Sequence, residues 1–133
     1  MKELTVSANN ANLGIVTDFI SEEMEKSAFD MKQIMQVSLV IEEVFTNIAN
    51  YAYSPKDGDV SIRACADEDK VVIEFQDSGA PYDPLAKEDP DITLSADDRK
   101  IGGLGIFLTK KMMDDVQYEY VDGKNVFIIT KNK

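Results

Sequence analysis

Hydrophobic and polar positions change their spacing several times along the chain, and each change marks an expected element. Apolar and polar residues alternate over Lys2–Ser7, as they do in a half-buried strand. Helical spacing follows and predicts one amphipathic helix from Leu13 to near Ala28 and a second, more apolar helix over Met31–Tyr53. Asp30 followed by Gln33 gives the second helix the signature of a capping box.

Alternation returns in the second half of the chain, after turn residues at Asp57-Gly58. Residues 78–101 hold no sustained period and contain prolines and an acidic stretch, which predicts a long loop of the kind that is usually functional. The elements expected in this half are the strand pair Val60–Ala66 and Val71–Asp77, the loop, a short helix over Ile106–Met113, and a second strand pair, Val116–Val121 and Asn125–Thr130, around Asp122-Gly123.

The order of these elements predicts the fold class. Strands come in pairs between helices instead of alternating singly with them, which favours an α+β protein. We expect a two-layer sandwich in which helices cover one face of a mostly antiparallel mixed sheet. Because the 133 residues contain no linker and no internal repeat, we expect a single domain over residues 1–133.

Composition narrows the functional classes. The 14 basic and 25 acidic residues give a formal net charge of −11, which repels nucleic acid and anionic membranes. The chain has no histidine and one cysteine, Cys65, which excludes histidine catalysis, a Cys/His zinc site and an internal disulfide. The sequence holds neither the apolar core of a signal peptide nor an apolar run of ~20 residues, so we expect a soluble cytoplasmic protein.

Two polar residues interrupt the apolar surface of the long helix. Glu43 and Asn47 are four positions apart, so their side chains leave adjacent turns in the same direction. An asparagine oxygen is a suitable Mg²⁺ ligand, and a nearby carboxylate can accept a proton from a hydroxyl group. The same pair is also common on helix faces that simply meet solvent.

Two further segments suit a phosphorylated ligand. Asp77 ends the strand before the long loop, where its carboxylate could accept a purine amino proton, and Gly79 would let a flat ring approach the backbone. Gly102-Gly103-Leu104-Gly105 precedes a helix, whose free N–H groups suit phosphate oxygens, with Arg99 and Lys100 as adjacent cations. Taken singly, these segments also fit a plain turn, a flexible hinge and a solvated basic pair.

Taken together and in this order, the motifs resemble those of the GHKL ATP-binding domains, which have the Bergerat fold. The resemblance covers essentially the whole chain, and within the family the chain is most similar to the anti-sigma-factor serine/threonine kinases. The matching segments are Glu42-Glu43-Val44-Phe45-Thr46-Asn47 with Tyr51-Ala52-Tyr53 for the N box, Asp77–Pro84 for the G1 box, and Gly102-Gly103-Leu104-Gly105-Ile106-Phe107-Leu108 for the G2 box.

The resemblance implies a role for each motif. Glu43 would act as general base and Asn47 would coordinate Mg²⁺. Asp77 would bind the adenine amino group, Gly79 would admit the ring, and residues 84–101 would close over the triphosphate as a lid. The other nucleotide contacts that the resemblance implies are Tyr82, Arg99, Lys100, Gly102, Gly103, Leu104, Gly105 and Ile106.

The resemblance also implies an activity. With ATP and Mg²⁺, the chain would phosphorylate a serine or threonine of a STAS-type anti-anti-sigma partner, and it would bind a sigma factor. The alternative is a non-catalytic switch that binds ATP and grips a client other than a sigma factor. A module cut from a histidine kinase is disfavoured, because the chain has no histidine.

Two local features qualify the resemblance. Relatives dimerise through the N-terminal strand, which makes Leu4 and Val6 candidate homodimer contacts here. The last hairpin departs from the sporulation branch, since it carries Gly123-Lys124-Asn125 where that branch tends to have Gly-Thr, on the phosphate side of the implied pocket. The departure points to a separate branch of the family.

Overall fold

The computed structural model of the chain describes residues 2–52, 58–81 and 103–133, with the side chains of residues 51, 52 and 103–106 left out. Three α-helices and five β-strands lie in these ranges. In chain order they are β1 Lys2–Ser7, α1 Leu13–Lys26, α2 Met31–Asn47, β2 Asp59–Ala66, β3 Lys70–Asp77, α3 Gly103–Met112, β4 Asp115–Val121 and β5 Lys124–Asn132.

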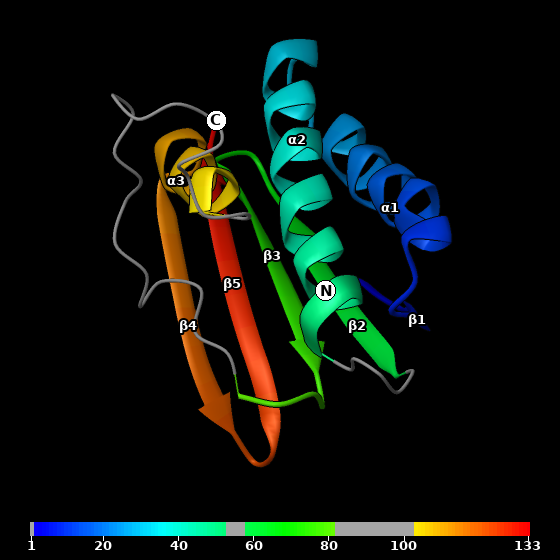
Figure 1. Cartoon of the computed structure of the whole chain (residues 1–133). Coiled ribbons are helices and arrows are strands. Elements are labelled where there is room, and N and C mark those ends of the chain that lie inside the picture. Colours follow the sequence, from blue (N-terminus) through cyan, green and yellow to red (C-terminus); the bar gives the residue numbers. More distant parts are fainter. Residues whose placement is uncertain (1, 53–57, 82–102) are drawn as a thin grey trace.

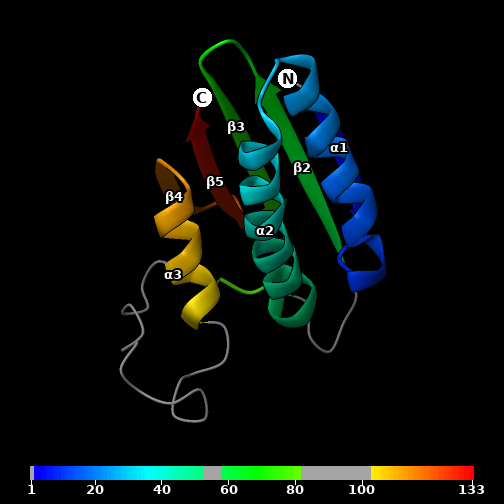
Figure 2. The same ribbon diagram turned by 90° about the horizontal axis from the view of Figure 1, so that it is seen from above.

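The strands form one sheet in the order β1-β2-β3-β5-β4. All four pairs in it are antiparallel, so the expected antiparallel character is confirmed, whereas the described strands contain no parallel pair that would make the sheet mixed. The helices α1, α2 and α3 lie on one face of the sheet (Figures 1 and 2). The α+β sandwich predicted from the sequence is therefore the fold of the chain.

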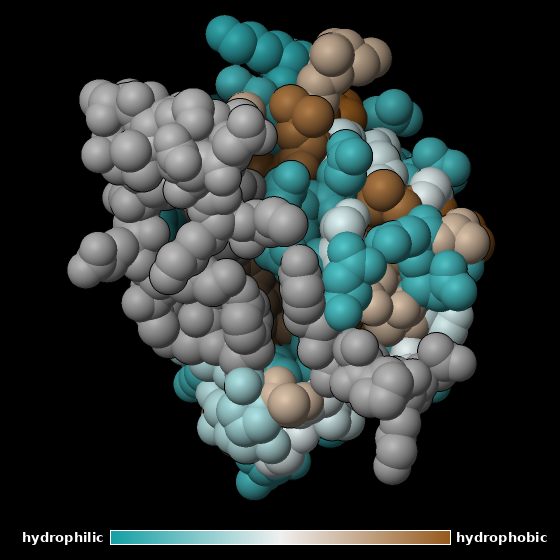
Figure 3. Space-filling model, viewed as in Figure 1, coloured by the Kyte–Doolittle hydropathy of each residue, from teal (hydrophilic) through white to brown (hydrophobic). Residues whose placement is uncertain are grey.

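Helix α2 supplies the centre of the core. Its inward face is buried against α1 and the sheet, and the buried residues are Ile34, Val37, Val40, Ile41, Val44 and Phe45. The opposite side of the same helix leaves Met31, Met35 and Leu39 more than half exposed. Figure 3 shows hydrophobic atoms at the surface over the upper part of α2, next to hydrophilic ones. The apolar residues of α2 thus extend beyond the face that the core needs.

Local chemistry fixes the ends of α1 and α2. The expected capping box is present: the Asp30 carboxylate accepts a hydrogen bond from the Gln33 backbone N–H at 2.8 Å, and the Gln33 side chain accepts one from the Asp30 N–H at 3.4 Å. Ala28, between the two helices, has a positive φ of 63°. Helix α2 was expected to reach Tyr53, but its α-helical part ends at Asn47 and continues as a wider π-helical turn over Ile48–Ala52.

Helix α3 begins earlier than the sequence suggested. It was expected over Ile106–Met113 with the glycine segment as its approach, whereas Gly103 is already its first residue. The glycines at 103 and 105 therefore lie in the first turn, where the backbone N–H groups have no partner within the helix. Helical hydrogen bonding has prevailed over the low helix propensity of glycine, which costs only about 1 kcal/mol per residue.

Two tight turns set the register of the sheet. Asp122 and Gly123 both have positive φ, 53° and 76°, which is the conformation of a two-residue turn whose twist matches the strands on either side. At the β2–β3 turn, the Asp67 carboxylate accepts hydrogen bonds from the backbone N–H groups of Asp69 and Lys70. These two N–H groups lower the pKa of Asp67 below its ordinary value, because they stabilise the ionised form.

Strand β1 is tied to α1 as well as to β2. Leu4 and Val6, proposed above as dimer contacts, pack half-buried against the chain's own core. The Lys2 ammonium lies 3.1 Å from the Glu23 carboxylate, which also pairs with Lys26 at 3.3 Å. Burial raises the pKa of Glu23, but the two ammonium groups outweigh it and lower the pKa overall. No helix in the described ranges has both the length and the apolar content for a membrane span.

The two sides of α2 give the first prediction. Ile41 is fully buried and Leu39 is 54% exposed on the same helix. We expect Ile41→Ala to lower the free energy of unfolding by about 2–5 kcal/mol, because it removes buried methyl groups and leaves a cavity, and Leu39→Ala to change it by less than about 1 kcal/mol. Urea unfolding followed by circular dichroism measures both. Equal losses in the two variants would contradict the assignment of the core face.

Candidate functional site

Three polar side chains are buried among the described residues, and all three lie where the sequence placed a site or beside it. They are Asp77 at the end of β3, Thr109 in α3 and Asn125 at the start of β5, exposed by 6%, 1% and 6%. Burying a polar group is costly unless it is hydrogen-bonded, so each of them needs a partner or a function. Two of the three are each other's partner.

The Asp77 carboxylate is held by one of its two oxygens. Oδ1 accepts hydrogen bonds from the Gly79 backbone N–H and from the Asn125 side-chain amide, both at 2.9 Å. Within the described ranges no hydrogen bond or ion pair reaches the second oxygen, Oδ2. A buried carboxylate oxygen without a partner is costly in an apolar setting, and it becomes useful if a ligand supplies the donor.

Asn125 stands directly opposite Asp77 in the β3–β5 ladder. Its amide nitrogen donates to Asp77 Oδ1 and to the Ala80 carbonyl at 2.9 Å each, with the Gly79 carbonyl at 3.4 Å. Its oxygen accepts a hydrogen bond from the Tyr118 hydroxyl of β4. The sequence interpretation placed this hairpin on the phosphate side of the pocket, whereas in the structure Asn125 contacts Asp77, the residue that the resemblance assigns to the adenine.

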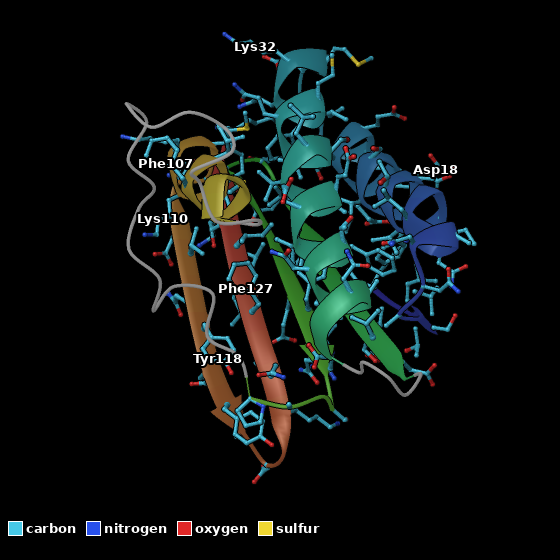
Figure 4. All side chains as sticks on the ribbon, in the orientation of Figure 1. Asp18, Lys32, Phe107, Lys110, Tyr118 and Phe127 are labelled. Atoms are coloured by element: carbon cyan, nitrogen blue, oxygen red, sulfur yellow. The ribbon has the colours of Figure 1, made fainter. Side chains whose placement is uncertain are left out.

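Sequence reasoning gave no role to Tyr118 and considered Asn125 only as part of the last hairpin, without a partner. In Figure 4 the labelled rings of Phe127 and Tyr118 lie below α3 along β5 and β4, on the face of the sheet that the helices cover. The period of two in β5 puts Asn125 on the same face as the buried Phe127. A polar residue at an inward position of a strand was the available signal, and only the pairing of β5 with β3 shows its partner.

Glu43 lines a hollow between α2 and α3 that does not include Asp77. This α2–α3 hollow has a volume of about 150 Å³ and is lined by Leu39, Val40, Glu42, Glu43, Leu108, Thr109 and Met112. Glu43 is half-buried, whereas its neighbour Glu42 is exposed. Among described residues, Glu43 makes no hydrogen bond or ion pair. The carboxylate therefore lines a recess beside α3, the helix that begins at Gly103.

Asn47 is the last residue of α2 proper and is half-buried. Its side-chain amide has no hydrogen-bond partner in the part of the chain that the structure describes. The same part contains no cluster of three or more Cys, Asp or Glu side chains that could hold a metal by itself. A single amide oxygen suits Mg²⁺, which commonly takes one or two protein ligands and fills its shell with phosphate oxygens and water.

The structure joins Asp77 to Gly79 by a hydrogen bond, whereas Glu43 and Asn47 lie on another element, α2. Figures 1 and 2 show the C-terminal ends of α2 and β3 at the same end of the molecule. Asp77 lines a polar hollow of about 390 Å³, with neighbours from β1, β2 and β5 that include Thr5, Ser61 and Lys124. Within the described ranges no hydrogen bond or ion pair links Glu43 or Asn47 to Asp77.

The remaining predicted contacts fall partly outside the described residues. Tyr82, Arg99, Lys100 and Gly102 lie outside them, as does the expected lid over residues 84–101. Gly103, Leu104, Gly105 and Ile106 form the first turn of α3, and the structure describes their backbone alone. Gly79 is described, and its backbone N–H is the one that holds Asp77.

Comparison with known sequences decides the family. Residues 6–131 match the profile of the histidine kinase-like ATPase domain, which leaves only a few residues uncovered at each end. The chain belongs to the histidine kinase-like ATPase domain family. The GHKL resemblance and the fold inferred from the motifs are thereby confirmed.

Curated relatives within this ATPase family carry regulatory names. The serine-protein kinase RsbW of Listeria monocytogenes serovar 1/2a is 29% identical over 111 residues, which cover 80% of this chain and 70% of the relative. The anti-sigma F factor of Clostridium acetobutylicum is 26% identical over 133 residues, covering 100% and 91% of the two chains. RsbW of Bacillus subtilis is 28% identical over 131 residues, covering 93% and 81%.

Solved structures agree on the fold of this ATPase domain. A Mycobacterium tuberculosis protein containing RsbU and RsbW domains superposes with a TM-score of 0.63 at 13% identity, covering 98% of this chain and 32% of that one. The chain thus spans about a third of that protein. The catalytic domain of the histidine kinase ThkA superposes with a TM-score of 0.55 at 17% identity, covering 100% and 98%.

Proposed function

We propose that the chain binds Mg²⁺ and ATP and transfers the terminal phosphoryl group to a hydroxyl of a partner protein. The observation that carries the proposal is the buried Asp77 carboxylate. Its Oδ1 accepts two hydrogen bonds, and within the described ranges no donor reaches its Oδ2. In a histidine kinase-like ATPase domain, a fixed acceptor at this strand end suits the amino group of adenine. The Gly79 backbone beside it suits the close approach of the ring.

The phosphates belong toward α2 and α3 in this proposal. The N–H groups in the first turn of α3, from Gly103 onward, would donate to phosphate oxygens, since a helix start favours negative charge. Asn47 would coordinate Mg²⁺ together with the phosphates. The ion would neutralise charge on the phosphate oxygens. This local arrangement is needed because the net charge of −11 opposes the binding of an anion.

Glu43 is the proposed general base. It would accept the proton of the partner's serine or threonine hydroxyl as the oxygen of that group bonds to the terminal phosphorus. The bond from that phosphorus to the bridging oxygen breaks, and ADP leaves with the electron pair. In phosphoryl transfer, positioning and charge neutralisation carry most of the catalysis. The half-buried position of Glu43 in the α2–α3 hollow supports this assignment.

The names of the relatives support a regulatory setting. We propose that the clients are a sigma factor and a STAS-type anti-anti-sigma protein, the second being the phosphorylated partner, and that the chain works in the cytoplasm as a single domain over residues 1–133. A homodimer is also proposed. Since Leu4 and Val6 pack inward, it would use the open edge of β1, which pairs with β2 on one side only.

Replacing Asp77 tests the nucleotide pocket. In this proposal Oδ1 accepts the two internal hydrogen bonds and Oδ2 accepts one from adenine. The amide of an Asp77→Asn variant would keep one acceptor oxygen and turn a donor toward the adenine amino group. We expect ATP affinity to fall at least about 10-fold, as removing a hydrogen bond to a charged group does. Calorimetric titration with ATP and Mg²⁺ measures it. The matched Asp67→Asn variant, at the exposed β2–β3 turn, is expected to bind like the parent.

Replacing Glu43 separates the two functional hypotheses. Glu43→Gln is expected to bind ATP normally and to slow phosphoryl transfer by about 10²–10⁴-fold, the usual contribution of a general base. The assay follows labelled phosphate from ATP to a STAS partner encoded beside the chain's own gene. Glu42→Gln, on the exposed neighbour, is the control. A parent protein that binds ATP and labels no partner hydroxyl would instead favour the non-catalytic switch.

Asn47 gives a metal-specific prediction. If its amide oxygen coordinates Mg²⁺, Asn47→Ala is expected to raise the Mg²⁺ concentration needed for half-maximal ATP binding about 10-fold or more, comparable with losses at other metal sites. Titration of Mg²⁺ at fixed ATP measures this shift. Asn50→Ala, on the following turn, is the matched control, and an unchanged Mg²⁺ requirement in Asn47→Ala would contradict the assignment.

A further inference from the structure

We propose that Asn125 is a positioning residue that holds the Asp77 carboxylate so that one oxygen is reserved for a purine amino group, and that Tyr118 in turn fixes Asn125. The inference rests on the proposed function and adds a determinant of nucleotide specificity to it. The two residues come from β5 and β4, outside the N, G1 and G2 boxes.

The neighbours of Asn125 determine which way its amide points. One end of the side chain faces three oxygens, from the Asp77 carboxylate, the Ala80 carbonyl and the Gly79 carbonyl. Three acceptors around one atom require that atom to be the NH₂ group, because an oxygen there would meet only other oxygens. Both hydrogens of this NH₂ group are used at 2.9 Å, on Asp77 and on Ala80.

This geometry gives the carboxylate a single orientation. Asp77 Oδ1 is occupied from two sides, by the Gly79 N–H of its own loop and by Asn125 of the neighbouring strand. The two donors come from different elements, so rotating the carboxylate would break both bonds. Oδ2 is left as an acceptor in a fixed direction. A fixed acceptor selects for a ligand donor and against a ligand oxygen at that point, which separates a 6-aminopurine from a 6-oxopurine.

Tyr118 completes the chain of hydrogen bonds. Its hydroxyl donates to the Asn125 oxygen, so the amide is fixed at both ends. Asn125 is directly opposite Asp77, and Tyr118 lies two residues before Tyr120, the β4 partner of Asn125. The three side chains thus form one network across β3, β5 and β4. Partners in such a network depend on one another, and removing one loosens the next.

The experiment compares two nucleotides that differ only in the amino group of the purine. ATP carries the purine amino group, and purine riboside 5′-triphosphate lacks it. Asn125→Leu keeps a similar side-chain volume and removes the amide, so we expect about 10-fold weaker ATP binding, with purine riboside triphosphate binding changed by less than about 2-fold. Calorimetric titration of the full chain with each nucleotide and Mg²⁺ measures both. A merely structural role would weaken the two nucleotides equally.

A milder variant keeps the test decisive if Asn125→Leu does not fold. Tyr118→Phe removes one hydroxyl from a half-buried ring, and we expect about 3-fold weaker ATP binding with purine riboside triphosphate unchanged. Tyr120→Phe is the matched control, since Tyr120 is 45% exposed and lies on the same strand. Circular dichroism and thermal unfolding establish that each variant is folded.

The outcomes separate the inference from the proposed function. Failure of the parent chain to bind ATP would refute the proposed function itself. The parent chain could bind ATP and lose this binding in Asp77→Asn, while Asn125→Leu and Tyr118→Phe bind ATP unchanged. This result would support the proposed function and overturn the role of Asn125. Equal weakening of both nucleotides in folded variants would overturn it as well. Selective weakening of ATP supports it.

Discussion

A buried carboxylate held without a positive charge is the constraint around which this end of the domain is organised. Asp77 is only 6% exposed, and within the described ranges its contacts are hydrogen bonds from neutral amides. Neutral N–H donors stabilise the negative charge without cancelling it, whereas a lysine or arginine would have neutralised it. The carboxylate consequently needs rigid surroundings, and the ladder between β3 and β5 supplies them.

The rest of the fold can be understood as support for this arrangement. Helix α2 packs its buried face against α1 and the sheet and carries the half-buried Glu43 and Asn47 outside that face, so one element both closes the core and contributes to the candidate site. Helix α3 begins at Gly103, and the N–H groups of its first turn have no partner within the helix. Core packing and the candidate site thus share the same helices, and a loss of packing in α2 would disturb both.

Local sequence signals predicted most of the fold. The capping box at Asp30 and the turn at Asp122-Gly123 each act within a few residues, and both are present as expected. Element boundaries at which opposing local preferences compete were predicted less accurately. Helix α3 was expected to begin after its glycines, yet Gly103 and Gly105 lie in its first turn, since helical hydrogen bonding outweighs the low helix propensity of glycine.

The candidate site was predictable only as far as its motifs were contiguous. Glu43, Asn47 and Asp77 stand out because a polar residue interrupts an apolar pattern at each position. The partner of Asp77 is 48 residues away along the chain, and nothing local in β5 announces the pairing. The two residues are paired by the register of β3 against β5, two strands that no hairpin turn connects. The pairing of Asp77 with Asn125 therefore had to come from the three-dimensional structure.

The two-residue turn at Asp122-Gly123 has an evolutionary consequence. Side chains on a strand alternate between faces, so one inserted or deleted residue at this turn that shifted the pairing would rotate Asn125 to the far side of the sheet. The β2–β3 turn has the same consequence for the pairing of β3 with β2, although Asp77 lies at the other end of β3. Across descendants of this chain, the β4–β5 hairpin should tolerate substitution yet resist any change in length.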